Sequence, residues 1–225
     1  MIVETLAEYI ERTRFMNWMP DEAEFIPHPQ VGQKVSDDGG YKPFWGDTML
    51  FWLDNTAISA LTDIQQKLYN EGLVLAKPLN SQQLHMTLHD LSHTMGCDRH
   101  WDEIRAAAEA ILSDLKNAEV ALEPVRLFPM MNTSIVAGYR PATEEDCRVL
   151  MEWYRAFDTL FSYGQPTFHV TLAYFRPDFS GRMEMKHLKQ ALEAADTMPL
   201  PKLLLTKENL VYQRFLNMNE YYSPR

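Results

Sequence analysis

The sequence predicts an α+β fold in which two similar lobes, each an antiparallel sheet flanked by helices, enclose a central cleft. Three observations predict this fold. Some segments alternate apolar and polar residues as strands do, and others repeat apolar residues every three or four positions as helices do. The order strand, helix, strand, helix, strand occurs twice along the 225 residues. The middle strand of each set carries the same pattern, His85-Met86-Thr87 in one and His169-Val170-Thr171 in the other.

Residues 1–46 are predicted to be an amino-terminal helix followed by an irregular extension. The helix is expected over 3–16, where apolar residues have helical spacing. The extension, over 20–46, is rich in Pro, Gly and Asp, which favour turns and loops. We expect it to cover one lobe or to lie near the mouth of the cleft.

The first lobe is predicted over residues 47–129 and contains the first motif. Its second helix shows the clearest pattern, with apolar residues at alternating steps of three and four that mark one buried face. The predicted elements are, in order, a strand over 49–53, a helix over 58–68, the motif strand over 84–90, a helix over 100–117 and a strand over 120–128.

The second lobe is predicted over residues 130–225 and repeats the same order, so that the two lobes together make one bilobal domain. Its first helix opens with Thr143 and Asp146, the spacing of a capping box. The predicted elements are, in order, a strand over 134–139, a helix over 143–162, the motif strand over 167–175, a helix over 183–195, and strands over 201–206 and 209–215.

The two motifs place a His and a Thr on the same face of each strand, because side chains alternate between the two faces of a sheet. The apolar residues between them would then face the core. In a regular strand His89 would share the face of His85 and Thr87, and Tyr174 would lie on the buried face, away from His169.

A pair of imidazoles with a pair of hydroxyls can perform phosphodiester chemistry without a metal. An unperturbed imidazole titrates near pH 6.5, so one His can accept a proton while the other donates one. We therefore predict His85 and His169 as general acid and base, with their roles left open, and Thr87 and Thr171 as hydroxyls that bind phosphoryl oxygens.

The chain is similar to the 2H phosphoesterase superfamily, whose members carry two His-x-Thr/Ser motifs in two related lobes. The resemblance covers roughly residues 47–206 and includes the residues around each motif, Gln83 to Leu88 and Phe168 to Tyr174. It implies that each lobe contributes its motif strand to a shared cleft. It also implies a hydrolase that opens 2',3'-cyclic phosphates on nucleotides or RNA ends.

Other interpretations remain open. The lobes would also suit a nucleotide-binding module without turnover, or an enzyme that processes or ligates RNA ends. If the first motif segment were helical, His85, His89 and His93 would share one face and suggest a metal-dependent phosphohydrolase.

Aromatic and basic groups bind bases and phosphates. The further candidates for lining the cleft are His89, Tyr163, Trp45 and Arg126.

Composition limits the partners of the protein. The formal net charge of −10 argues against a groove for long nucleic acid and leaves a small nucleotide or an RNA end as the expected substrate. No cofactor and no metal are predicted, and the oligomeric state is not predicted. The acidic start and the lack of a long apolar run predict a cytoplasmic protein that does not enter a membrane. Cys97 and Cys147 are expected to be separate buried thiols.

Overall fold

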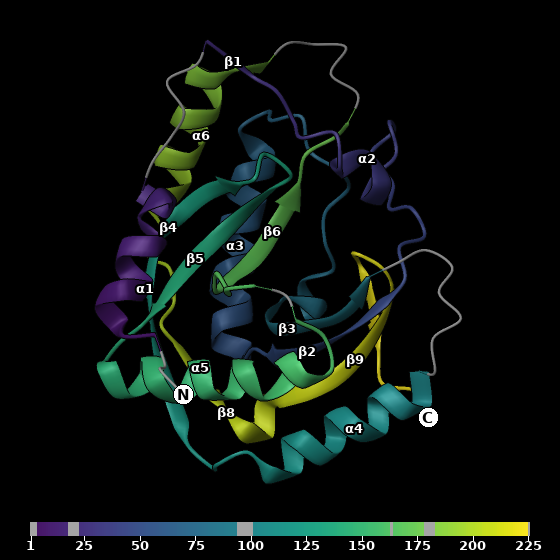
Figure 1. Ribbon diagram of the computed structural model, residues 1–225. Helices are drawn as coiled ribbons and strands as arrows, with labels where there is room; N and C mark the ends of the chain where they lie inside the picture. Colours follow the sequence, from purple (N-terminus) through teal and green to yellow (C-terminus); the bar gives the residue numbers. More distant parts are fainter. Residues whose placement is uncertain (1–3, 18–22, 94–100, 163, 178–182, 225) are drawn as a thin grey trace.

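A computed structural model of the chain describes residues 4–17, 23–93, 101–162, 164–177 and 183–224. Its centre is an eight-stranded sheet that curls strongly (Figure 1). The strands are β2 (Gly46–Trp52), β3 (His85–His93), β4 (Glu119–Met130), β5 (Ser134–Pro141), β6 (His169–Tyr174), β8 (Leu203–Thr206), β9 (Leu210–Asn217) and β10 (Glu220–Tyr222). Their order is β10-β9-β2-β3-β6-β5-β4-β8, and all neighbours are antiparallel.

The sheet has two halves that meet where β3 pairs with β6. One half is β10-β9-β2-β3 and the other is β6-β5-β4-β8, and a single residue pair, Met86 with Val170, joins them. The α+β class, the antiparallel sheets and the two-part arrangement agree with the prediction. The halves do not follow the predicted division of the chain at residue 129. Almost all of the strand β4 precedes this point and lies with β6, whereas β9 and β10 follow it and lie with β3.

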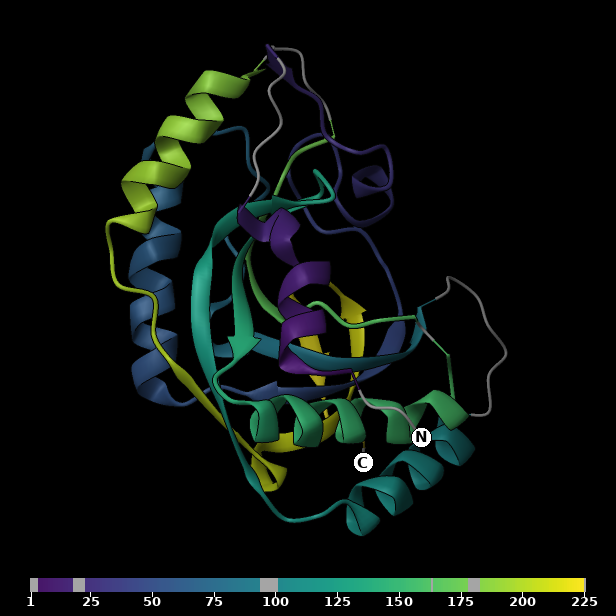
Figure 2. The ribbon, with the colours of Figure 1, turned by 60° about the vertical axis from the view of Figure 1, so that its left-hand side comes forward.

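Four long helices pack against the sheet. They are α3 (Asn55–Asn70), α4 (Trp101–Asp114), α5 (Glu144–Ala156) and α6 (Met185–Asp196). The helices α3 and α6 lie side by side along one flank of the molecule, while α5 and α4 run along another (Figures 1 and 2). In the described part of the chain, no helix has the length and the apolar character needed to cross a bilayer.

Two of the long helices begin at a capping side chain, and the sequence predicts the one at Thr143. The side chain of Asp54 accepts a hydrogen bond from the Ala57 N–H at 2.8 Å and starts α3, and Thr143 caps α5 in the same way. The predicted helix over 143–162 ends sooner, at Ala156. There the backbone tightens into the 3-10 turn η3 (Phe157–Thr159), which buries the Phe157 ring completely.

The amino-terminal segment contains more structure than predicted. It forms α1 (Leu6–Arg12), η1 (Arg14–Asn17), β1 (Glu24–Phe25) and α2 (Val31–Lys34). Three further short elements lie later in the chain. They are η2 (Ser81–Gln83) before β3, β7 (Met183–Glu184) after β6, and η4 (Lys207–Asn209) after β8. The strand β1 pairs with β7 in a separate two-stranded sheet. Strands of two or three residues carry no detectable alternation, which is why the sequence predicts neither these nor β10.

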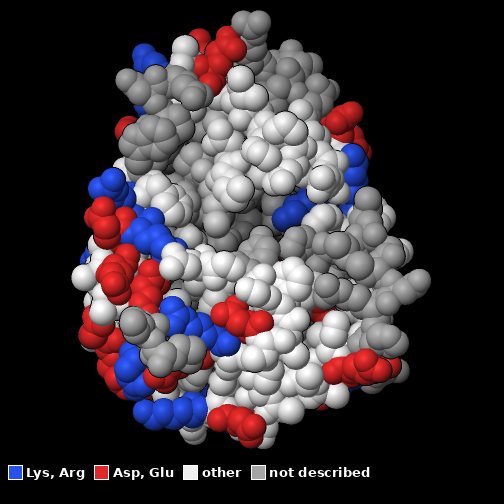
Figure 3. Space-filling view, viewed as in Figure 1, with Lys and Arg blue, Asp and Glu red and all other residues white. Residues whose placement is uncertain are grey.

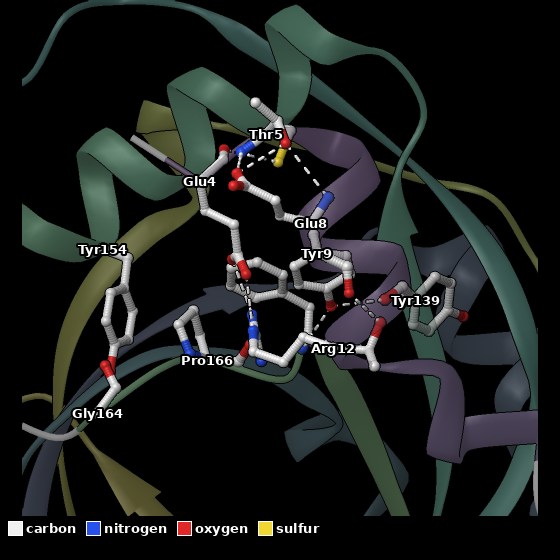
Figure 4. A network of polar contacts seen from close by, with 12 residues as sticks. Glu4, Thr5, Glu8, Tyr9, Arg12, Tyr139, Tyr154, Gly164 and Pro166 are labelled. Atoms are coloured by element: carbon white, nitrogen blue, oxygen red, sulfur yellow. Dashed lines mark hydrogen bonds and ion pairs between the residues drawn. The ribbon is translucent and has the colours of Figure 1, made fainter. Parts of the chain in front are cut away.

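The helix α1 fastens the start of the second motif strand to its neighbour. Its Tyr9 is fully buried, and the Tyr9 hydroxyl donates to the Tyr139 carbonyl at 3.0 Å while it accepts from the Phe168 N–H at 3.1 Å (Figure 4). Arg12, held by an ion pair with Glu4, donates to the carbonyl of Pro166 at 3.0 Å. The backbone just before the second motif is therefore positioned by the amino-terminal helix.

We expect Tyr9→Phe to lower the free energy of unfolding by about 1–3 kcal/mol, because it leaves a buried N–H and a buried carbonyl without their shared partner. Urea unfolding measures this loss. Tyr139→Phe is the matched control. The Tyr139 hydroxyl is buried and has no hydrogen-bond partner in the described part of the chain, so its removal should be neutral or stabilising. Equal losses in the two variants would contradict the role given to the Tyr9 hydroxyl.

Candidate active site

The two motifs lie on neighbouring strands and are paired at their centres. Met86 of β3 is opposite Val170 of β6, and the strands run in opposite directions. Each motif His is therefore adjacent to the Thr of the other motif across the strand pair. Met86 and Val170 are fully buried on the core side, so the His and Thr side chains lie on the opposite face of the sheet. The structure brings the four predicted residues together.

A β-bulge follows each motif at the same position. In β3 the extra residue is Leu88, and in β6 it is Leu172, in both cases the residue directly after the motif Thr. A bulge reverses the side-chain alternation beyond it. As a result Asp90 and Tyr174, at corresponding positions in the two strands, line the same pocket as the motifs. The expectation that Tyr174 points away from His169 is wrong for this reason.

The bulge also moves His89, predicted as a candidate for lining the cleft, to the other face of β3. The His89 side chain is buried, with Nδ1 2.7 Å from the Asp90 carbonyl and Nε2 3.2 Å from a carboxylate oxygen of Asp158. Its ring also packs on Tyr154, with the ring centres 4.5 Å apart. His89 therefore holds the bulged backbone instead of lining the pocket.

The motif residues line a cavity of about 320 Å³, a size suited to a small ligand. Figure 3 shows this face of the molecule hollowed near its centre. Lys34, from α2, is the one lysine or arginine among the lining residues described, and Asp90 is the one carboxylate. Neither was predicted. The aromatic residues of the wall are Phe44, Tyr174, Phe215 and Tyr221.

The two imidazoles have identical backbone anchors. His85 Nδ1 lies 2.7 Å from the carbonyl of Gln83, and His169 Nδ1 lies 2.6 Å from the carbonyl of Thr167, so each ring contacts the residue two positions earlier. Because a carbonyl only accepts, each Nδ1 carries the hydrogen. In the neutral ring Nε2 then keeps its lone pair, and the anchor fixes the orientation of both rings.

Burial sets the charge state of both imidazoles. It lowers the pKa of His85 to about 4, and the neighbouring His169 lowers it further while the bond to Gln83 opposes the change. Burial also lowers the pKa of His169, where Asp90 acts in the opposite direction and Lys34 adds to the decrease. Among the described residues, a carboxylate therefore favours the protonated form of His169 and none does so for His85.

We predict that this burial makes the protein less stable in acid. The pKa of His85 is lower in the folded than in the unfolded chain, so the unfolded chain binds more protons below about pH 6.5. The contribution of His85 to the free energy of unfolding should thus be constant above about pH 7 and decrease as the pH falls toward the folded-state pKa of about 4. Urea unfolding at several pH values should show a smaller decrease in His85→Gln than in the wild type. Equal pH dependence in the two proteins would contradict the buried neutral ring.

The other predicted residues lie elsewhere. Trp45 is half exposed beside a separate surface pocket with Trp101 and Arg214, and Arg126 pairs with Asp196 at 3.3 Å. Neither lines the cavity of the motifs, so both predictions are wrong. Tyr163 lies outside the described residues.

The interpretation as a metal cluster on a helix is also wrong. The first motif segment is a strand, and its bulge places His85 and His89 on opposite faces. Among the described side chains, which do not include that of His93, no group of three His, Cys, Asp or Glu could hold a metal. Cys147 is a buried free thiol as expected, whereas Cys97 lies outside the described residues.

Comparisons with known proteins bear on the fold. No protein-family model and no curated protein matches the sequence. A conserved protein of unknown function from Agrobacterium tumefaciens, ATU0111, is similar at a TM-score of 0.65 and 20% identity over 88% of this chain and 92% of that chain. Escherichia coli LigT, crystallised with phosphate, has a TM-score of 0.47 and 10% identity over 80% of this chain and 98% of that chain. TT0787 of Thermus thermophilus has a TM-score of 0.44 and 18% identity over 76% of this chain and 86% of that chain. The chain thus shares the α+β fold of the Agrobacterium protein over most of both lengths.

Proposed function

We propose that this chain is a metal-independent phosphodiesterase of the 2H type that hydrolyses a 2',3'-cyclic phosphate on a nucleotide or an RNA end. The pairing of Met86 with Val170 carries this proposal, because it sets two imidazoles and two hydroxyls diagonally around one pocket. An in-line displacement at phosphorus needs a base and an acid on opposite sides of the phosphorus, with hydrogen-bond donors between them.

In the proposed reaction one neutral imidazole removes a proton from water at Nε2, and the water oxygen bonds to phosphorus. The second, protonated imidazole gives its proton to the ribose oxygen as the bond between this oxygen and phosphorus breaks. The product is a phosphate monoester with a free ribose hydroxyl. The hydroxyls of Thr87 and Thr171 donate to the non-bridging oxygens, where negative charge increases in the transition state.

The aromatic wall suits a nucleoside. The ring of Tyr221 lies 4.4 Å from that of His85, and Phe44 and Phe215 stack with their centres 6.4 Å apart. Flat faces of this kind can pack against a base, whereas the pocket has one lysine and no other lysine or arginine among its described lining residues. The substrate we propose is therefore small, or the end of a longer chain.

The test is a panel of 2',3'-cyclic mononucleotides, cyclic dinucleotides and short RNAs with a cyclic phosphate end, assayed with and without EDTA. We expect the 2',3'-cyclic substrates to be opened to monoesters at a rate that EDTA does not change. Loss of the activity in EDTA would contradict the metal-independent mechanism. Saturable binding without product in single-turnover assays would instead identify a nucleotide-binding module.

A further inference from the structure

We infer that Lys34 is a phosphate-binding residue of this pocket and contacts the same phosphoryl group that the two motifs surround. This inference rests on the proposed function. It assigns part of the site to the amino-terminal segment, which lies outside the two-motif region.

The position of Lys34 is fixed by the chain around it. Val31 and Val35, on either side along the segment, are buried, and the Lys34 carbonyl accepts a hydrogen bond from the Lys42 N–H at 2.9 Å. The loop beyond α2 is tied to the body of the protein, because the Gly39 carbonyl accepts from the Lys77 N–H at 2.8 Å. The backbone therefore holds the Lys34 side chain at the pocket.

The side chain of Lys34 is directed by two aromatic rings. Its Nζ lies 5.1 Å from the centre of the Phe44 ring and 5.8 Å from that of Tyr174, and both rings line the pocket. Contacts of this kind attract a cation without neutralising its charge. No carboxylate of the described residues lies within ion-pair distance of Lys34 Nζ.

The charged residues that line this pocket are Lys34 and Asp90. Burial lowers the pKa of Lys34, and Asp90 opposes this effect. Lys34 in turn lowers the pKa of His169, as expected for a cation in the same pocket. A cation that has lost part of its hydration and makes no direct ion pair gains from a ligand with negative charge. The phosphoryl group between the motifs is that ligand.

A packing role for the Lys34 stem is the alternative, since long side chains often lie on aromatic surface for this reason alone. Lys34→Met separates the two roles, because Met keeps an unbranched apolar chain over the rings and removes the charge. Lys77→Met is the matched control. It removes an equal charge near the same loop, but Lys77 is two-thirds exposed and lies outside the pocket.

The experiment measures binding of inorganic phosphate by calorimetry and, separately, hydrolysis of a 2',3'-cyclic nucleotide. We expect Lys34→Met to weaken phosphate binding and to lower kcat/KM by about ten- to a hundredfold each, the usual value of a charged hydrogen bond. Lys77→Met should match the wild type, and Lys34→Arg should recover part of the binding. Nuclear magnetic resonance titration should also show the pKa of His169 raised in Lys34→Met only.

Unchanged phosphate binding in Lys34→Met, or no binding in the wild type, would overturn the inference. Phosphate binding tests the role of Lys34, and hydrolysis of the cyclic nucleotide tests the proposed function, so the two proposals can fail separately. A wild-type protein that binds phosphate through Lys34 but opens no cyclic phosphate would contradict the proposed hydrolysis and leave the assignment of Lys34 in place.

Discussion

His85→Asn and His169→Asn should each lower the rate of cyclic phosphate hydrolysis by a factor of about 100 to 10,000, the range for a positioned acid or base. Asn is chosen because its side-chain N–H can replace the hydrogen bond that Nδ1 makes to the backbone carbonyl, whereas nothing replaces Nε2. The variants should therefore fold, and their far-ultraviolet circular dichroism and melting temperature should remain close to those of the wild type.

The control is His187→Asn. His187 lies on α6, its Nε2 is 2.8 Å from the Glu71 carbonyl, and it does not line the pocket. Its substitution should leave hydrolysis unchanged. Full activity in either motif variant would remove the chemical basis of the proposed function.

The structure also predicts which imidazole is the acid. Asp90 favours the protonated form of His169, whereas the pKa of His85 is lowered to about 4 and no carboxylate of the described residues opposes this decrease. We therefore expect His169 to protonate the leaving oxygen and His85 to act as base. A phosphodiester with a 4-nitrophenolate leaving group needs little acid catalysis. It should restore much of the lost rate in His169→Asn and little in His85→Asn, and the reverse result would exchange the roles.

The alternation of side chains along the two motif strands was enough to predict that their His and Thr residues face one way. Alternation describes only a regular strand, however, and the single residues Leu88 and Leu172 break it. Each is an ordinary apolar strand residue, so nothing in the sequence shows that it is the extra residue of a bulge. For this reason the sequence pattern puts His89 on the face of His85 and Thr87, and it does not identify Asp90 and Tyr174 as residues that line the pocket.

Local sequence patterns also do not identify pocket residues that come from segments far from the motifs in the chain. Lys34 lies in a stretch without periodic pattern, and it reaches the pocket through the packing of Val31 and Val35 and the backbone hydrogen bonds of this segment. Tyr221 reaches His85 because β9 and β10 return to the half of the sheet that contains β3. Pairing between strands so far apart depends on the whole fold, and local sequence cannot specify it.

The motif threonines allow an equally direct test of phosphate binding. Thr87→Val keeps the branched shape and the strand preference of Thr but removes the hydroxyl. If the hydroxyl donates to a phosphoryl oxygen in the transition state, the rate should fall by about 100- to 1,000-fold, as for loss of one oxyanion donor. Thr87→Ser keeps the hydroxyl and should retain most of the activity. Steady-state kinetics with a 2',3'-cyclic nucleotide measures both variants.

Thr171 requires a second control, because its side chain acts on the pKa of the buried Tyr174 phenol, which lines the same pocket. Thr171→Val removes a donor to phosphate and also a group that acts on the buried Tyr174 phenol. The change in the hydrolysis rate can therefore come from either loss. Combining Thr171→Val with Tyr174→Phe removes the phenol hydroxyl as well, so that only the loss of the donor to phosphate can affect the rate. If the hydroxyl of Thr171 binds phosphate, the double variant should stay as slow as Thr171→Val, and Tyr174→Phe alone should be nearly as active as the wild type. Recovery of the rate in the double variant would show that Thr171 acts only through Tyr174.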